Sequence, residues 1–395
     1  MKLKTLKDFN PAGKRVLVRV DFNVPLSGGT ISDDTRMRCA LPTLKYLLDK
    51  GASLVLMSHL GRPKGEKKPE YSMAQLREHL AEISGAEVIM APDVIGVEVE
   101  KLSSALKPGQ ILLLENTRYY LQETDNDADF SKSLARLGDV YVNDAFGSAH
   151  RAHASTEGLA RLLPSYAGLL MEKECSFFDK ILQNPEKPFV AIIGGAKVSS
   201  KIAVLESLLD KADAFVIGGG MAYTFMKVQG KSVGKSLVED DFADTARSFL
   251  DKAESRGVKV LLPLDHVVAA EFSASAKPEL LDAVNVPDGK LAMDVGPKTI
   301  EAVRELLANA KTVVWNGPMG VFEFDLFAQG TLDVAKLVAD CKGVSVVGGG
   351  DSVAAVNKFG LADKMDHVST GGGASLEYLE GRVLPGVAIL KGALS

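Results

Sequence analysis

The chain has 395 residues, of which 46% are hydrophobic and 25% are charged, and its formal net charge is -5 at pH 7. This composition excludes a disordered chain, and the acidic balance argues against general affinity for nucleic acid or for an anionic membrane. The three cysteines, Cys39, Cys175 and Cys341, are widely spaced, which indicates neither a disulfide framework nor a zinc site and fits a reducing cytosol. No apolar run reaches the ~18 residues of a membrane-spanning helix, so we expect a cytoplasmic protein.

Short apolar runs alternate with amphipathic segments along the chain, a pattern typical of parallel α/β sheets. The first predicted elements are the strand KRVLVRVDFNV, a helical stretch from Thr35 to Asp49, and the strand ASLVLMSH. Further strand candidates are AEVIMAPD, QILLLEN, DVYVND, FVAIIGG, DAFVIGG, KVLLPLDHV, KTVVWNGP and GVSVVGGG. This number exceeds one sheet of the usual size, so we expect two sheets in two domains.

A domain boundary is indicated where a helical pattern from about Leu169 to Leu182 ends before Pro185 and Pro188. We interpret this segment as a linker helix over residues 169–184. It would join an N-terminal domain, residues 1–168, to a C-terminal domain, residues 185–378. The last segment, residues 379–395, is apolar without forming an obvious βα unit, and we expect it to pack back onto the first domain.

Arginines gather at the predicted strand ends of the first half. In parallel sheets ligands bind outside the carboxyl ends of the strands, and guanidinium groups bind carboxylate and phosphate oxygens bidentately. The sequence therefore predicts a site for a small, highly anionic ligand. The pair His150 and His153 lacks a third metal ligand, so we interpret both as anion donors or structural histidines. The residues that follow these strands are Asp21, Asn23, His59, Arg62, Arg118 and Arg151, and Arg36 begins the helix after the first loop.

Glycine-rich turns dominate the second half: GGAKVSSK, GGGMAYT, DVGPKT, WNGPMGVFE, GGGDS and STGGGAS. Glycine allows backbone N–H groups to approach phosphates, and a following helix adds its positive dipole end. The recurrence of these turns, together with Lys197, Lys201 and Asp351, favours a nucleotide site. If a helix begins directly after the glycines of GGAKVSSK, Lys197 and Lys201 lie on one face at i and i+4.

Two alternative functions must be compared with this interpretation, a dinucleotide dehydrogenase and a non-catalytic binding protein. No glycine triplet completes G-x-G-x-x-G and no P-loop is present, which disfavours a dinucleotide dehydrogenase. A non-catalytic two-lobe binding protein for organic anions stays open at this point, although it does not need the lysine-rich nucleotide half.

The ordered set RVDFNVP, SHLGRP, NDAFGSAHR, GGAKVSSK, WNGPMGVFE, GGGDS and TGGGAS resembles the phosphoglycerate kinase family along nearly the whole chain. The resemblance implies an α/β fold with two Rossmann-like lobes, each a mainly parallel sheet flanked by helices, joined by a linker helix and a hinge. It implies a monomer in glycolysis that transfers a phosphoryl group in line, after lobe closure, between 1,3-bisphosphoglycerate and ADP, giving 3-phosphoglycerate and ATP with Mg²⁺.

The resemblance also assigns roles by motif position. The triose ligands would be Asp21, Phe22, Asn23, Arg36, His59, Leu60, Gly61, Arg62, Arg118 and Arg151, with His150 and His153 in the same basic patch. The nucleotide ligands would be Gly195, Lys197, Lys201, Asn316, Glu323, Gly349, Gly350, Asp351 and Ser352, with Asp351 similar to the magnesium ligand. Arg36, Lys197 and Gly373 would be catalytic: Arg36 and Lys197 would place positive charge over the phosphoryl oxygens, and Gly371 to Gly373 resemble the loop that offers N–H groups to the phosphoryl. Tyr119 stands where phenylalanine is often found.

Overall fold

The computed structural model describes residues 2–392, and its internal contacts divide them into two compact units. The first unit runs to Ser176 and resumes at Val383, and the second is Phe177–Arg382. Helix α6, Leu169–Gln183, connects them covalently. The domain limits given above remain a proposal, and the predicted returning segment 379–395 includes residues 393–395, which lie outside the described residues.

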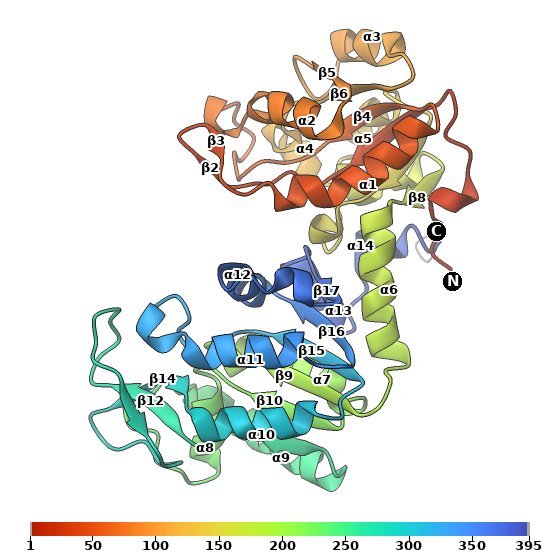
Figure 1. Ribbon diagram of the computed structural model, residues 1–395. Coiled ribbons are helices and arrows are strands. Elements are labelled where there is room, and N and C mark those ends of the chain that lie inside the picture. Colours follow the sequence, from red (N-terminus) through yellow and green to blue (C-terminus); the bar gives the residue numbers. More distant parts are fainter. Residues whose placement is uncertain (1, 393–395) are drawn as a thin grey trace. The chain divides into compact units, whose positions relative to one another are not determined.

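The first unit contains a six-stranded sheet in which every neighbouring pair is parallel (Figure 1). Its spatial order is β5-β6-β4-β1-β7-β8. Strands β4, β5 and β6 lie on one side of β1, and the chain then crosses to add β7 and β8 on the other side. The direction of winding therefore reverses between β1 and β7. The strands are β1 Arg15–Arg19, β4 Ser53–Met57, β5 Glu87–Met90, β6 Gln110–Leu113, β7 Val140–Asn143 and β8 Ser165–Ala167.

Two helix layers cover this sheet because β-branched and leucine side chains point alternately to its two faces. Helices α1, Thr35–Asp49, and α2, Arg77–Ser84, pack on the face that carries Val16 and Val18. Helices α3, Val97–Ala105, and α5, Ala128–Ala135, pack on the face that carries Leu17 and Tyr141. The short elements of this unit are β2 Leu26–Ser27, β3 Thr30–Ile31, α4 Leu121–Thr124 and α14 Pro385–Ala388.

The second unit contains another six-stranded parallel sheet, with the spatial order β11-β10-β9-β15-β16-β17. Its winding reverses between β9 and β15, as in doubly wound nucleotide-binding folds. Two parallel sheets flanked by helices confirm the predicted fold class. The strands are β9 Phe189–Ile193, β10 Ala214–Ile217, β11 Lys259–Leu261, β15 Thr312–Asn316, β16 Val344–Gly348 and β17 His367–Val368.

The second sheet is also covered on both faces. Helices α10, Pro297–Leu307, α11, Gln329–Ala339, and α12, Gly350–Lys358, share a core with Trp315, and Figure 1 shows α10 and α11 side by side across the sheet. On the opposite face Phe215 makes an edge-on contact with Phe249 of α9, Ala243–Ser255, at 5.3 Å between ring centroids. The remaining helices are α7 Ile202–Leu209, α8 Ala222–Val228 and α13 Gly373–Leu379.

A third, antiparallel sheet was not predicted. It has the order β13-β12-β14, formed by Glu279–Leu281, His266–Ala269 and Leu291–Val295. The expected single strand KVLLPLDHV is wrong, because its first part is β11 of the parallel sheet and its last part belongs to β12. Pro263 lies between them and has no N–H to donate to a ladder, which explains the break.

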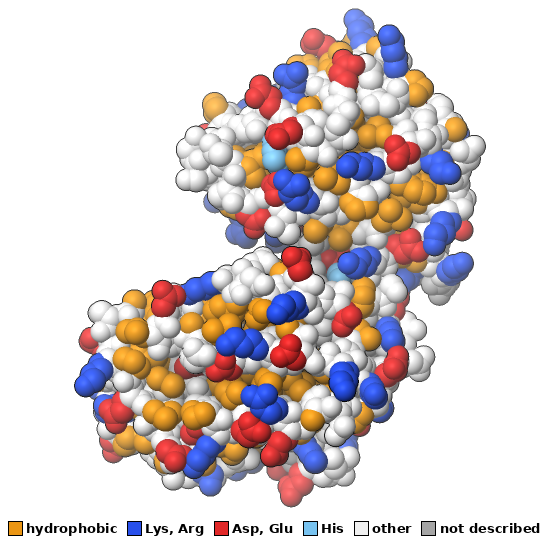
Figure 2. All heavy atoms as spheres, viewed as in Figure 1, with side chains coloured by type: hydrophobic (Ala, Val, Ile, Leu, Met, Phe, Trp, Pro, Cys, Tyr) orange, Lys and Arg blue, Asp and Glu red, His pale blue; other side chains and the backbone are white. Residues whose placement is uncertain are grey.

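The outer surface carries both signs of charge. On the face drawn in Figure 2, Lys and Arg side chains alternate with Asp and Glu over each unit, and no broad patch of one sign covers it. Within residues 2–392, no helix combines the length and the apolar character needed to cross a membrane.

Candidate active site

The loop after β1 holds the first predicted anion ligands around one guanidinium group. Arg36, in the first turn of α1, donates from Nη1 to the Asn23 carbonyl at 3.0 Å and to Asp21 Oδ1 at 3.3 Å. The Asn23 backbone N–H donates to Asp21 Oδ1 at 3.2 Å, which closes the loop on itself. Arg36 is half-buried, and its guanidinium group is therefore held in place before any ligand arrives.

Gly61 joins this loop to the loop that follows β6. Its N–H donates to Asn23 Oδ1 at 2.8 Å, and its carbonyl accepts from Arg118 Nη1 at 3.0 Å. At φ +63°, an added Cβ would be strained and would clash with the Tyr71 ring, which favours glycine at this position. Asn116, which sequence reasoning missed, supports the same loop by donating to the Leu60 carbonyl at 2.7 Å.

Three arginines from three strand-end loops line one pocket. Arg62, Arg118 and Arg151 surround a hollow of about 320 Å³, whose other wall includes Tyr120 and Leu121. Arg118 is half-buried, and burial together with the charges of Arg19 and Arg151 lowers its pKa to about 10. This convergence of guanidinium groups creates a strongly positive site of the size of a small anion.

A buried polar network lies beneath these arginines, and the sequence analysis did not single out its central member. Arg19 is 1% exposed and donates to Ser155 Oγ at 2.8 Å, and Ser155 Oγ donates to the buried carboxylate of Glu123 at 2.5 Å. Arg19 Nη2 also lies 3.1 Å from His59 Nδ1. Because a guanidinium group only donates, Nδ1 accepts, and neutral His59 carries its proton on Nε2.

Two histidines of the patch, His59 and His153, are kept neutral. Burial, reinforced by Arg19 and Arg118, lowers the pKa of His59 well below its ordinary value. The same causes lower the pKa of His153 to about 3. The third histidine, His150, accepts from Arg151 Nε at 3.1 Å. His59 and His153 are therefore neutral at pH 7.

Two of the predicted triose ligands place their side chains in the core. Phe22 is fully buried and Leu60 is 3% exposed, and both pack in the cluster between the sheet and α1. Their side chains fix the loops, and only their backbone atoms remain as ligand groups. The Phe22 N–H donates to Ser58 Oγ at 2.8 Å.

In the second unit, glycines meet where the winding reverses between β9 and β15. The Gly195 N–H donates to the Pro318 carbonyl at 3.2 Å, and its carbonyl accepts from the Met221 N–H at 3.0 Å. Gly219 has φ +68°, and a Cβ there would lie 2.5 Å from the Gly195 carbonyl oxygen. The turns after β9, β10 and β15 therefore contact one another through bare backbone, as a close phosphate approach requires.

The expected helical spacing of Lys197 and Lys201 is wrong. Lys197 is extended, with φ -131° and ψ 134°, and precedes a single 3₁₀ turn, Val198–Ser200. Lys201 follows that turn, and α7 begins only at Ile202. Lys197 is exposed, whereas Lys201 is largely buried and donates to Asn316 Oδ1 at 2.5 Å. Burial lowers the pKa of Lys201.

Asn316 links this lysine to the turn after β16. Its Nδ2 donates to the Gly348 carbonyl at 2.9 Å, and Gly349, at φ +89°, leaves 2.7 Å between a hypothetical Cβ and that Nδ2. Gly350 begins α12, with Asp351 exposed in its first turn. Ser352 is buried and accepts from the Gly317 N–H at 2.5 Å. The N-terminus of α12 therefore lies beside the β15 turn.

A mainly apolar pocket of about 260 Å³ opens beside these glycine turns. Gly195, Glu323 and Asp351 line it, which brings three predicted nucleotide residues together. Sequence reasoning missed its apolar wall, because single leucines, methionines and phenylalanines resemble any core residue in the sequence. That wall includes Leu237, Phe272, Leu291, Met293 and Val321. The predicted Gly373 is exposed and begins α13 after Gly372, whose φ is +52°.

The donor set suits a magnesium ion that is carried by a nucleotide. Among residues 2–392 no group of three or more His, Cys, Asp or Glu side chains could hold a metal by itself. Mg²⁺ in phosphotransferases is bound by one or two carboxylates together with substrate phosphates and waters. The exposed carboxylate of Asp351, on the edge of the pocket, fits such a site.

Comparison with known proteins gives one result. The family model for phosphoglycerate kinase matches residues 6–382. The phosphoglycerate kinase of Borrelia hermsii is 61% identical over 99% of this chain and 100% of its own length, and that of Leptospira biflexa is 55% identical over 99% and 98%. The solved structure of phosphoglycerate kinase from Coxiella burnetii is 42% identical, covers 100% of both chains and superposes with a TM-score of 0.90. The chain therefore belongs to the phosphoglycerate kinase family.

Proposed function

We propose that the arginine set of the first unit binds the triose, and that the glycine turns of the second unit bind the nucleotide. With this division the chain carries out the reaction of its family, the reversible transfer of a phosphoryl group from 1,3-bisphosphoglycerate to ADP. This reaction gives 3-phosphoglycerate and ATP in glycolysis. We further propose that the protein acts as a monomer in the cytoplasm.

The observation that carries the triose assignment is the pocket lined by Arg62, Arg118 and Arg151. 3-Phosphoglycerate bears a carboxylate and a phosphate, and guanidinium groups are the side chains best suited to bind both. Arg36 lies in the same hydrogen-bonded network through Asn23 and Gly61. A bound carboxylate within this network would face Arg36, while the phosphate occupies the three-arginine pocket.

The nucleotide assignment rests on the second pocket. Its apolar wall suits a base, Glu323 supplies acceptors for ribose hydroxyls, and the glycine turns offer backbone N–H groups to phosphates. Lys197 is exposed and free to reach phosphate oxygens, whereas Lys201 is fixed on Asn316. Asp351 would hold Mg²⁺, which neutralises developing charge on the phosphoryl oxygens when it is bound.

The chemistry requires no general base. In the ATP-forming direction the nucleophile is a phosphate oxygen of ADP, and in reverse it is a carboxylate, and both are already ionised at neutral pH. Catalysis then depends on alignment and on positive charge over the equatorial phosphoryl oxygens. Arg36, Lys197 and the N–H groups of the Gly371–Gly373 turn are the groups that we assign to this role.

A coupled assay of ATP formation from 1,3-bisphosphoglycerate tests the catalytic assignments. Arg36→Ala and Lys197→Ala are each expected to lower kcat by about 10² or more, because their contacts strengthen as charge moves in the transition state. Lys45→Ala provides a matched control, since Lys45 is an exposed cation on the same helix as Arg36. Near-normal turnover in either of the first two variants would remove that residue from the catalytic set.

A further inference from the structure

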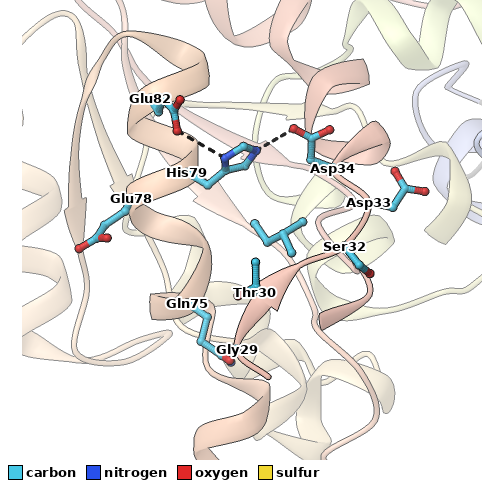
Figure 3. Close-up of a pocket in the computed structure, with 10 residues that line it drawn as sticks. Gly29, Thr30, Ser32, Asp33, Asp34, Gln75, Glu78, His79 and Glu82 are labelled. Atoms are coloured by element: carbon cyan, nitrogen blue, oxygen red, sulfur yellow. Dashed lines mark hydrogen bonds and ion pairs between the residues drawn. The ribbon is translucent and has the colours of Figure 1, made fainter. Parts of the chain in front are cut away.

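We infer that His79 and Asp34 form a clamp that positions Arg36 for the reaction. This inference rests on the role proposed above for Arg36. The clamp lies between the start of α1 and the first turn of α2, and neither residue belongs to the predicted triose ligands. Figure 3 shows the His79 ring between Asp34 and Glu82, with the ring nitrogen nearer α1 directed at the Asp34 carboxylate.

The contacts of Asp34 are unusual for its position. Asp34 is the residue before the first turn of α1, where an aspartate side chain ordinarily accepts a hydrogen bond from a backbone N–H of that turn. Its carboxylate makes no such capping bond. Asp33 takes over this function, because its Oδ1 accepts from the Thr35 N–H at 2.8 Å. The Asp34 carboxylate is instead used for contacts between side chains.

Two partners fix that carboxylate. Arg38, one turn along α1, donates from Nε to Asp34 Oδ1 at 2.9 Å and lies 2.8 Å from Oδ2 through Nη2. His79 Nε2 lies 2.7 Å from Asp34 Oδ2. The hydrogen bond to Arg38, followed by that to His79, lowers the pKa of Asp34 against the effect of partial burial, so the carboxylate is ionised at neutral pH. The first turn of α1 is thereby tied to α2.

Arg36 is the residue of α1 that this tie controls. It lies two residues after Asp34, and the Asp34 carbonyl accepts from the Arg38 N–H at 3.0 Å, so Asp34 and Arg36 belong to one rigid turn. The reach of the Arg36 guanidinium to Asn23 and Asp21, 3.0 Å and 3.3 Å, depends on where that turn lies. Misplacement of a catalytic group by about 1 Å can lower the rate about 10²-fold.

The clamp adds a specific polar contact to the apolar packing between α1 and α2. A hollow of about 590 Å³ adjoins it, lined by Gly29 to Asp34, Gln75, Glu78, His79 and Glu82. Buried Met37 of α1 and Leu80 of α2 share one apolar cluster, and the contact between His79 and Asp34 adds a directional polar link between the same two helices. The hydrogen bond from His79 links the two helices beside this hollow (Figure 3).

A double-mutant cycle on the full chain tests the clamp. His79→Leu removes the donor, and we expect it to lower kcat about tenfold with the KM for ATP unchanged. In an Arg36→Ala background the same substitution should change kcat less than about twofold, because there is no longer a guanidinium to misplace. His79→Gln retains an N–H donor at a similar reach and should recover most of the activity. Asp34→Ala, which removes the acceptor, should repeat the pattern if His79→Leu folds poorly.

Glu78→Gln serves as a matched control, because Glu78 lines the same hollow and is exposed on the same helix. The clamp is overturned if His79→Leu lowers kcat by equal factors with and without Arg36, or if wild-type kcat survives both His79→Leu and Asp34→Ala. Normal turnover in Arg36→Ala alone would instead overturn the proposed role of Arg36. The two failures are therefore distinguishable.

Discussion

The histidines of the anion site are neutral because of what surrounds them. Burial disfavours a protonated imidazole at His153, and the guanidinium groups of Arg19, Arg118 and Arg151 add repulsion, so that its pKa is lowered to about 3. The positive potential that binds an anion therefore comes from the arginines and from Lys64, which lines the same pocket, and not from the imidazoles of His59 and His153. Protons would compete for these imidazoles only in strongly acidic solution.

This neutrality predicts a pH-dependent contribution to stability. The unfolded chain protonates His153 near pH 6.5, whereas the folded chain does so only near pH 3. The contribution of His153 to the free energy of unfolding is therefore complete above about pH 6.5 and is lost as the pH falls, by about 1.4 kcal/mol per pH unit. In His153→Gln this loss should disappear.

Denaturant unfolding of both proteins between pH 6.5 and pH 4 measures the effect. The comparison must be made between variants, because burial raises the pKa of Asp144 and of Asp294 to about 7, and these groups contribute stability in the opposite sense, which is lost as the pH rises. Both carboxyls are present in each protein, so their contribution cancels in the difference. A stability difference that stays constant over this pH range would contradict a neutral His153.

At the scale of elements, the turns after β9 and β10 depend on bare backbone. Gly219→Ala would place a Cβ 2.5 Å from the Gly195 carbonyl oxygen, in addition to the cost of φ +68°. We expect a loss of about 2–4 kcal/mol in the free energy of unfolding and a raised KM for ATP. Gly230→Ala, at φ +77° with no atom within 4 Å of the added Cβ, should cost about 1 kcal/mol. Equal losses in the two variants would show that close approach at Gly219 is unimportant.

Sequence patterns predicted the buried parallel strands well, because β1, β4, β9 and β15 are short runs of apolar residues that are buried on both faces. They failed where local geometry or a non-local partner decides the structure. Lys197 and Lys201 are separated by a 3₁₀ turn, and β13 and β14 pair with β12 only through tertiary contacts.

The candidate site shows the same limits. Strand-end arginines were visible in the sequence because charged residues directly after apolar runs are conspicuous. Arg19 and Asn116 were missed, since each is embedded in or next to a strand and its hydrogen-bonding partner lies far along the chain. The clamp between Asp34 and His79 spans 45 residues, and no spacing rule connects two such positions.

The two proposed ligand sets belong to different units of the chain. Arg62, Arg118 and Arg151 lie in the first unit, and Lys197 and Asp351 lie in the second. In-line transfer requires the donor phosphate and the acceptor oxygen to be near contact, and it requires that water is excluded from the phosphoryl group. Lobe closure thus follows from the proposed division of the ligands and stays a prediction.

Solution X-ray scattering of the full chain measures closure. The radius of gyration is expected to decrease when 3-phosphoglycerate and a non-hydrolysable ATP analogue with magnesium are both present, and to decrease less with either ligand alone, because each ligand by itself satisfies only one set. Arg118→Ala should bind the nucleotide normally and fail to contract, since the missing guanidinium weakens only the triose set. An active sample whose dimensions stay constant with both ligands bound would contradict closure, and the phosphoryl would then have to reach its acceptor with both units already in place.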